Sequence, residues 1–148
     1  MSVLEKTGDA RVLICVGAGG VGKTTTSAAL ACLLAREGRR VALVTIDPAK
    51  RLADALGIGE LGGEPQPVSL PDAGGELWAL MLDPQGTFDG LVANLARDEE
   101  SRRAILENPI YARISGAVAG SQEFTAVAKL YELDRSERFD AIVLDTPP

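Results

Sequence analysis

The residues of this sequence that are best suited to chemistry lie in one short stretch, GAGGVGKTT, from Gly17 to Thr25. Its glycines allow the backbone to turn tightly and to bring several N–H groups close to an anion, because no Cβ stands in the way. The spacing from Gly17 to Thr24 matches GxxxxGK(S/T), in which a lysine and a hydroxyl-bearing residue follow the last glycine. The stretch therefore predicts a loop that binds the phosphates of a nucleotide.

Each side chain of this loop has an expected role. Lys23 is expected to reach the β- and γ-phosphates, the Thr24 hydroxyl to ligate Mg²⁺, and Thr25 to add a hydrogen bond to the α-phosphate. A helix that begins at Lys23 would direct its positive dipole end at the same anion. The residues expected to form the nucleotide site are Gly19, Gly20, Val21, Gly22, Lys23, Thr24 and Thr25. The alternative, a glycine-rich turn that binds nothing, is disfavoured by the apolar run before the loop and the helical pattern after it.

Two aspartates are the other candidates for metal binding or catalysis. Asp145 ends the apolar run AIVLD, the pattern of a Walker B strand, and its carboxylate is expected to hold Mg²⁺ through a water. Asp47 follows VALVTI, and its carboxylate could orient the water that attacks the γ-phosphate. Each could instead simply end a strand and start a turn, and Asp-Pro is an ordinary turn starter. For Asp47, spacing alone leaves both interpretations open.

The elements that must position these residues follow from the hydrophobic pattern. Residues 11–16, RVLICV, predict a short strand that is buried on both faces. Residues 23–37 carry leucines at helical spacing and end before Gly38, a typical C-terminal signal. Residues 41–46, VALVTI, predict a second buried strand. This βαβ unit implies a parallel sheet with a right-handed crossover.

Strands and helices continue to alternate along the rest of the chain. A short helix is expected at AKRLADALGI after a turn at Pro48, and then a loop, which we expect to be mobile, at about 57–75. ELWALMLD predicts a third strand, residues 84–135 a helical segment with breaks near Pro109 and Gly120, and AIVLD a fourth strand. The pattern predicts an α/β fold, the three-layer α/β/α arrangement of P-loop NTPases with a mainly parallel sheet, cut short after the Walker B strand.

The chain stops at Pro148, directly after the last predicted strand. A parallel sheet needs helices on both faces, and a central strand with nothing after it leaves one side thinly covered. We therefore expect residues 1–148 to be the N-terminal part of a P-loop ATPase domain that belongs to a longer protein.

Composition narrows the possible classes of protein. A chain of 148 residues can form one domain with a real core. The formal net charge of −6 disfavours an electrostatic interaction with nucleic acid. No apolar run approaches the roughly 20 residues of a membrane helix, and the N-terminus lacks a signal-peptide pattern, so a cytoplasmic location and no membrane segment are expected. The absence of histidine excludes histidine-based acid–base chemistry.

Together, the three motifs resemble the anion-transporting ATPase family, which includes the arsenical-pump and tail-anchored-protein-targeting ATPases and has a deviant loop written KGGxGK(S/T). The resemblance covers essentially the whole chain. GGVGKTTTSAALA is similar to the family's loop and first helix, TIDPAKRLADALG to its first switch, and IVLDTPP to its second switch. LWALMLDPQGTFD is similar to its third strand, and GSQEFTAVAKLYEL to the helix before the second switch.

The resemblance implies specific roles for the candidate residues. It makes Asp47 the water-activating carboxylate, so that Asp47 and Lys23 are the expected catalytic residues. Asp145 and Thr24 become the expected Mg²⁺ ligands, and Thr146 begins a nucleotide-sensing switch. The implied activity is hydrolysis of ATP with Mg²⁺, in a dimer whose switch loops couple nucleotide state to the handling of a protein client or an anion.

The main departure from the family pattern is Ala18, which occupies the position of the family's first loop lysine. In a face-to-face dimer that lysine reaches the nucleotide of the opposite subunit. A methyl group cannot supply the cation, whose contribution is comparable to that of an arginine finger, on the order of 10³–10⁵ in rate. We therefore expect a homodimer or a heterodimer and favour a heterodimer with a related, lysine-bearing subunit. Lys50 also departs, since histidine is common there, and the chain ends before the family's adenine pocket and client-binding helices.

Other functions stay open. The main alternative is a nucleotide-bound, non-hydrolysing regulatory or scaffold subunit of a heterodimer, because Ala18 could abolish turnover. A partition or septum-site ATPase is disfavoured by the acidic charge, and a small-molecule kinase by the lack of an acceptor-pocket signature. In the arsenical-pump branch, metalloid binding uses cysteines. Cys15 and Cys32 lie in apolar runs without CxxC spacing, so we expect two buried thiols and favour a protein-handling or regulatory role.

Overall fold

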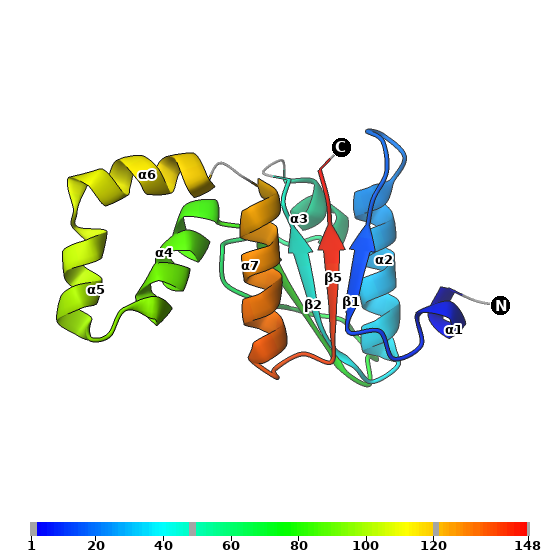
Figure 1. Cartoon of the computed structure of the whole chain (residues 1–148). Coiled ribbons are helices and arrows are strands. Elements are labelled where there is room, and N and C mark those ends of the chain that lie inside the picture. The colour runs from blue at the N-terminus through cyan, green and yellow to red at the C-terminus, as the bar shows by residue number, and fades with distance from the viewer. Residues whose placement is uncertain (1–2, 48–49, 120–121, 148) are drawn as a thin grey trace.

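A five-stranded sheet forms the centre of the part of the chain that the structure, a computed structural model, describes: residues 3–47, 50–119 and 122–147. Its strands are β1 Val12–Cys15, β2 Arg40–Thr45, β3 Gln66–Val68, β4 Glu76–Met81 and β5 Ala141–Asp145. They lie in the order β1-β5-β2-β4-β3, and all neighbours are parallel except β3 and β4 (Figure 1). The predicted mainly parallel sheet is confirmed.

Helices cover both faces of this sheet. They are α1 Val3–Thr7, α2 Lys23–Arg36, α3 Arg51–Leu56, α4 Pro84–Leu95, α5 Glu99–Leu106, α6 Pro109–Ala119 and α7 Gln122–Arg135. Helices α2 and α3 pack on one face and α7 on the other, while α4, α5 and α6 form an arm that projects beyond α7 (Figure 1). The predicted α/β/α layering is confirmed.

The central strands face two separate cores. In β2, Val41 and Leu43 belong to the core on the α2 side, whereas Ala42 and Val44 belong to the core on the α7 side. All of these side chains are at most 1% exposed. A parallel strand with helices on both faces is buried at every position, which explains the continuous apolar runs of β2 and β5. The two central buried strands are therefore as predicted.

Strand β1 differs from its prediction, because only one of its faces is buried. Leu13 and Cys15 pack against the core on the α2 side, whereas Val12 and Ile14 are 38% and 53% exposed. Within the described residues, β1 pairs with β5 alone and lies at the edge of the sheet. A continuous apolar run does not distinguish a central strand from an edge strand with one open face, and the prediction of burial on both faces is wrong.

The predicted loop at 57–75 also needs correction, because it contains β3. This short strand pairs antiparallel with β4 at the other edge of the sheet. Its middle residue, Pro67, masks the strand pattern in the sequence. Proline cannot donate to a ladder, but it is tolerated in a strand at the edge of a sheet.

The predicted helical segment at 84–135 is confirmed, with one break more than expected. Helix α4 ends before Ala96, and Asp98 then caps α5 by accepting a 2.7 Å hydrogen bond from the backbone N–H of Ser101. That hydrogen bond lowers the pKa of the Asp98 carboxyl. An aspartate followed by acidic residues is a typical start of a helix, which explains the additional break. The predicted turn at Pro48 and break at Gly120 lie outside the described residues.

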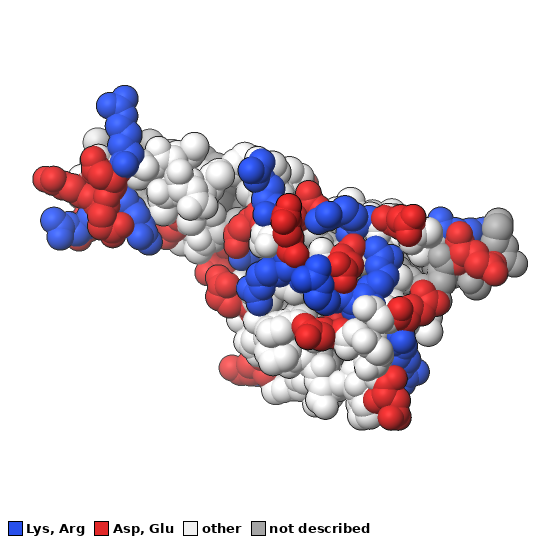
Figure 2. Space-filling model, turned by 90° about the horizontal axis from the view of Figure 1, so that it is seen from below, with Lys and Arg blue, Asp and Glu red and all other residues white. Residues whose placement is uncertain are grey.

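Charges of both signs are interspersed on the face at the amino ends of the strands (Figure 2). Arg40 and Asp140 form an ion pair of 2.7 Å at the start of β2 and β5, and Arg11 and Asp134 form one of 2.9 Å. Basic and acidic side chains are therefore paired at this end of the sheet. None of the described helices is long and apolar enough to cross a membrane.

Candidate nucleotide-binding site

The glycine-rich loop joins β1 to α2 at the carboxyl end of the sheet. Gly22 is the N-cap of α2, with a φ of 88°, and no side chain caps this helix. A residue with a Cβ would be strained in this left-handed conformation by about 1–2 kcal/mol. Because the amides of the first helical turn have no intrahelical acceptor, they are available to an anion. The local structure is that of the predicted phosphate-binding loop.

This loop borders an open cavity of about 630 Å³. The predicted site residues that line it are Gly19, Gly20, Gly22, Lys23, Thr24, Thr25 and Asp47. The cavity lies where the parallel strands end, which is the edge at which open α/β sheets bind ligands. Residues from the loop and from the end of β2 are thus brought together around one space.

Val21 and Asp145 are the predicted site residues that do not line the cavity. The Val21 side chain is 64% exposed, so its main-chain amide is the candidate ligand group. Asp145 is only 1% exposed and contacts the cavity through its hydrogen bond with Thr24. It forms a buried layer of the site behind the threonine.

The Lys23 amine holds the loop in shape. Nζ donates hydrogen bonds to the carbonyl oxygens of Gly17, at 2.8 Å, and Ala18, at 2.9 Å. An ammonium group has three N–H donors, and these bonds use two of them. The lysine therefore stabilises the conformation of the loop at Gly17 and Ala18, and its side chain also lines the cavity.

The buried Asp145 carboxylate is satisfied by three hydroxyl groups. Oδ2 accepts hydrogen bonds from Thr24 Oγ1, at 2.8 Å, and Thr45 Oγ1, at 3.2 Å. Ser27 Oγ, at 3.3 Å from Oδ1, shares its one proton between this oxygen and the carbonyl oxygen of Lys23, at 2.9 Å. A buried carboxylate without such donors would be strongly disfavoured. The network ties the end of β5 to the start of α2 and to the end of β2.

The donors at Thr24 and Asp145 suit Mg²⁺ in the presence of a nucleotide. Protein sites for this ion commonly supply one or two carboxylates and leave the remaining positions to phosphate oxygens and water. One carboxylate beside one threonine hydroxyl is such a set. Among the residues that the structure describes, no group of three or more His, Cys, Asp and Glu could hold a metal ion by itself. The residues present therefore fit a magnesium ion that is completed by phosphates.

Asp47 lies directly after β2 and is paired with an arginine. Its backbone N–H donates to Thr45 Oγ1 at 3.2 Å, and its Oδ2 accepts from Arg51 Nη1 at 3.0 Å. The Asp47 side chain is 16% exposed and that of Arg51 65% exposed. Both side chains line the cavity beside the loop. Thr45 thus fixes the backbone of Asp47, and Arg51 fixes its carboxylate at the cavity wall.

Three residues of this site were not predicted from the sequence: Ser27, Thr45 and Arg51. Each nevertheless had a spacing signal. Ser27 follows Thr24 by three residues in α2, so the two share a helical face. Arg51 follows Asp47 by four residues and has the opposite charge, although Asp47 itself precedes α3. Thr45 precedes Asp47 by two residues, and in the sheet it lies opposite Asp145. The last relation depends on strand order, which no local pattern contains.

Thr146 and the two cysteines complete this end of the sheet. Thr146 lines the cavity, and its hydroxyl donates a 2.7 Å hydrogen bond to the carbonyl oxygen of Cys15. Cys15 and Cys32 are free thiols that pack against the core on the α2 side, but both are only partly buried, so the prediction of buried thiols is confirmed only in part. Partial burial raises the pKa of the Cys32 thiol.

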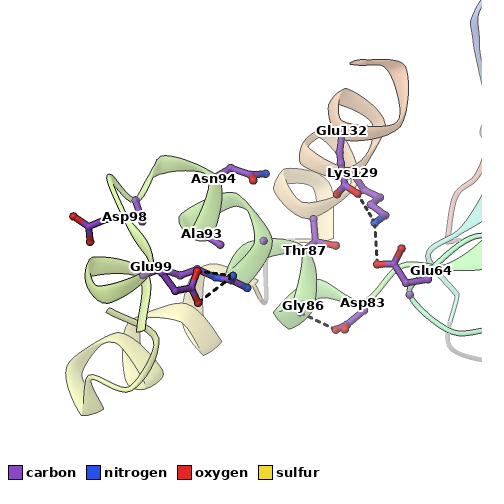
Figure 3. A pocket seen from close by; sticks show the side chains of 14 residues that line it. Glu64, Asp83, Gly86, Thr87, Ala93, Asn94, Asp98, Glu99, Lys129 and Glu132 are labelled. Atoms are coloured by element: carbon purple, nitrogen blue, oxygen red, sulfur yellow. Dashed lines mark hydrogen bonds and ion pairs between the residues drawn. The ribbon is translucent and has the colours of Figure 1, made fainter. Parts of the chain in front are cut away.

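A second cavity, of about 550 Å³, lies away from the loop between α4, α5 and α7 (Figure 3). Lys129, which is 4% exposed, reaches it from α7 and donates a 3.0 Å hydrogen bond to Glu132. Its Nζ also lies 4.0 Å from a carboxylate oxygen of Glu64. None of the predicted site residues lines this cavity, so it is separate from the loop site.

A mainly parallel α/β/α sheet whose first strand leads through a glycine-rich loop into a helix, with Lys23 and Thr24 at its start, defines a P-loop nucleotide-binding domain. The sequence pattern of one family, described as anion-transporting ATPase, matches residues 10–148. The chain belongs to the anion-transporting ATPase family, and the resemblance that its motifs indicated is confirmed.

Several relatives of this chain carry the name ATPase GET3. It is 34% identical to ATPase get3 of Aspergillus terreus over 133 residues, which cover 89% of this chain and 38% of that protein. It is 33% identical to ATPase GET3 of Podospora anserina over 132 residues, which again cover 89% of this chain and 38% of that protein. With ATPase GET3 of Malassezia globosa it shares 32% over 136 residues, 92% of this chain and 38% of the relative. The chain thus spans a little over a third of the length of these curated relatives.

Proposed function

We propose that the protein binds ATP together with Mg²⁺ in the cavity beside the loop and hydrolyses the γ-phosphate. The observation that carries this proposal is the convergence of Lys23, Thr24 and Asp47 on one cavity at the uncapped start of α2. Membership of an ATPase family supports the same activity. The three groups correspond to the charge, the metal ligand and the water-orienting carboxylate that phosphoryl transfer to water requires.

The loop residues would bind the triphosphate. Lys23 would contact the β- and γ-phosphates, Thr25 the α-phosphate, and the main-chain amides of the loop the oxygens between them. The main-chain donors in this proposal are those of Gly19, Gly20, Val21 and Gly22. Thr24 and Asp145 are the residues proposed to hold Mg²⁺, which would supply positive charge to neutralise the charge that develops on the phosphates.

Asp47 would hold the attacking water. In this proposal its carboxylate accepts a hydrogen bond from water and so fixes the position of the water oxygen. Thr45 supports the assignment because its hydroxyl accepts from the Asp47 N–H and donates to the Asp145 carboxylate. The Thr45 hydroxyl thus links the two aspartates by hydrogen bonds, and we propose that it couples the position of the water site to that of the metal site.

We further propose that the domain works as a dimer whose nucleotide state controls the handling of an anion or a protein client. The family description names anion transport, and the resemblance of the two switch segments to those of targeting ATPases supports a protein client. Thr146, at the start of the second segment, already connects the cavity to β1 through Cys15. The choice between a homodimer and a heterodimer stays a prediction.

Titration of the full-length protein with Mg-ATP tests the binding step. We expect heat on calorimetry and protection against thermal unfolding, since a ligand that binds only the folded state stabilises it. Lys23→Met should weaken binding on the order of 100-fold, because a charge-assisted contact to phosphate is lost. Lys6→Met, which changes an exposed lysine of α1, is the matched control. Absence of binding by the wild-type protein would refute the proposal.

A second candidate function follows from Ala18, which provides no ammonium group at the loop. Under this alternative the protein binds nucleotide without hydrolysing it and acts as a regulatory or scaffold subunit. A single-turnover measurement separates the two functions, since a hydrolysing protein converts its bound ATP to ADP and a scaffold retains it.

A further inference from the structure

Two cationic side chains line the phosphate cavity among the described residues, Lys23 and Arg51. Lys23 donates to the loop carbonyls of Gly17 and Ala18, and the proposed function assigns it to the β- and γ-phosphates. Ala18 contributes no charge. Among the described residues that line this cavity, Arg51, at the first position of α3, is therefore the cation that can add to Lys23 at the γ-phosphate.

The contact that Arg51 makes is poorly explained as a stabilising ion pair. Its guanidinium pairs with Asp47 at 3.0 Å, but the Arg51 side chain is 65% exposed. An ion pair with one such exposed partner contributes at most about 1 kcal/mol. What the pair does achieve is to hold a guanidinium at the cavity wall, beside the carboxylate proposed to orient water. Guanidinium has five N–H donors in a planar fork, and that geometry matches phosphate oxygens.

We propose that Arg51 is a catalytic residue that supplies, within the same subunit, the positive charge that Ala18 cannot supply. The inference rests on the proposed hydrolysis of ATP. In that reaction a water oxygen bonds to the γ-phosphorus, the bond from phosphorus to the β,γ-bridging oxygen breaks, and ADP leaves with the electron pair. The proton lost by water ends on the released phosphate. Arg51 donates hydrogen bonds to the γ-phosphate oxygens and stabilises the charge that builds up during the transfer.

This role has a consequence for assembly. A lysine donated across a dimer interface is no longer needed for turnover, so a subunit bearing Ala18 can hydrolyse ATP without a lysine-bearing partner. The same guanidinium also contacts Asp47, so the water-orienting carboxylate and the phosphate share one anchor. The heterodimer expected from Ala18 then ceases to be a requirement of the chemistry.

Lys50 is a matched control for Arg51. The two cations are adjacent in sequence, and both side chains are 65% exposed. Lys50 pairs with Glu60 at 2.6 Å and lines a neighbouring cavity, whereas Arg51 lines the cavity at the loop. If only the general surface charge matters, replacing either Lys50 or Arg51 by glutamine should change the rate of ATP hydrolysis equally. If charge at the phosphates matters, only the replacement of Arg51 should lower the rate.

The experiment compares the full-length wild type with Arg51→Gln, Arg51→Lys and Lys50→Gln. Three quantities are measured: the single-turnover rate, the affinity for Mg-ATP, and the affinity for Mg-ADP with aluminium fluoride, which mimics the phosphoryl group in transfer. For Arg51→Gln we expect a rate lower on the order of 10²–10³-fold, with a Mg-ATP affinity within a few-fold of wild type. Its binding of the fluoride complex should fall at least about 10-fold more than its binding of ADP. Arg51→Lys should recover part of the loss, and Lys50→Gln should match wild type.

Two results with Arg51→Gln would overturn the inference. One is an Arg51→Gln variant that hydrolyses ATP and binds the fluoride complex as the wild type does. The other is a variant that loses Mg-ATP affinity and rate to the same extent, since Arg51 would then only help to hold the substrate. A wild type that binds Mg-ATP without measurable turnover would contradict the inference as well, because Arg51 would then not replace the charge that Ala18 lacks. Failure of the wild type to bind Mg-ATP would instead refute the proposed function itself.

Discussion

The Thr24 hydroxyl donates a 2.8 Å hydrogen bond to Oδ2 of Asp145, although 121 positions separate the two residues in the chain. The contact joins the first turn of α2 to the last residue of β5. Thr45 and Ser27 donate to the same carboxylate, so the buried acid is held from three directions. A site whose supporting residues are already in place loses little free energy to rearrangement when a ligand binds.

Thr24→Val tests the proposed metal role of this pair. Valine keeps the shape of threonine but removes the hydroxyl, so binding of ATP in the presence of Mg²⁺ should weaken by about 10-fold or more. Binding measured with EDTA should change much less. Thr26→Val, an exposed threonine two residues further along α2, is the control and should behave as the wild type. Equal losses with and without Mg²⁺ would show that Thr24 acts on the loop rather than on the metal.

Asp47→Asn tests the proposed role in orienting water. Asparagine retains the size of the side chain but is a weaker acceptor, so the single-turnover rate should fall by about 10²-fold or more. Affinity for Mg-ATP should stay within a few-fold. Asp54→Asn is the matched control, because Asp54 lines the same cavity from further along α3. If the two variants lose the same rate, negative charge in the cavity matters and the position of Asp47 does not.

Asp140 should contribute to stability in a defined pH window. Hydrogen bonds from the Arg40 side chain and backbone N–H lower its pKa from 3.8 to about 2. Because the folded-state pKa is depressed, the contribution is complete above about pH 4 and is lost as the pH falls toward 2. The side chain is 42% exposed, so solvent screening limits the contribution to less than about 1 kcal/mol.

Urea unfolding of wild type and Asp140→Asn between pH 2 and 6 checks this expectation. The difference between their free energies of unfolding should shrink as the pH falls through the window. Arg40→Gln removes the largest cause of the pKa shift, the side-chain hydrogen bond, but keeps the backbone N–H, and should reduce the same pH dependence. Parallel curves for wild type and Asp140→Asn over the whole range would contradict the assignment.

The loop and its flanking elements could be predicted because independent local signals agree there. Glycine spacing, the apolar run before Gly17 and the helical pattern after Lys23 all place a strand, a turn and a helix in the same order. The ends of β2 and β5 could be predicted in the same way, since each is an apolar run that an aspartate terminates. These signals depend only on neighbours in the chain.

The rest of the site depends on how distant segments are ordered in space. Strand β5 lies between β1 and β2, and this places Asp145 opposite both Cys15 and Thr45. No local sequence pattern predicts this strand order. The same ordering leaves β1 at an edge, with Ile14 exposed. Arg51 could have been found from its spacing to Asp47, but its position on the cavity wall required the fold.

Lys129 provides a last prediction, on the second cavity. The lysine is 4% exposed, and its two carboxylate partners, Glu132 and Glu64, have side chains that are 51% and 87% exposed. Lys129→Met removes the buried charge but keeps an unbranched apolar side chain, and the freed carboxylates can be hydrated (Figure 3). We therefore expect a change in the free energy of unfolding within about 1 kcal/mol of zero, in either direction, because burying an ion pair contributes little net stability.

Lys129→Ala should be clearly less stable than Lys129→Met. Alanine also loses the packed aliphatic stem, at a cost of about 1–2 kcal/mol, which is toward the low end for a truncated core side chain because water can enter the adjoining cavity. Chemical denaturation of the two variants beside the wild type measures the difference. Should Lys129→Met be as unstable as Lys129→Ala, the ammonium group rather than the stem would be what stabilises the junction between α7 and the arm.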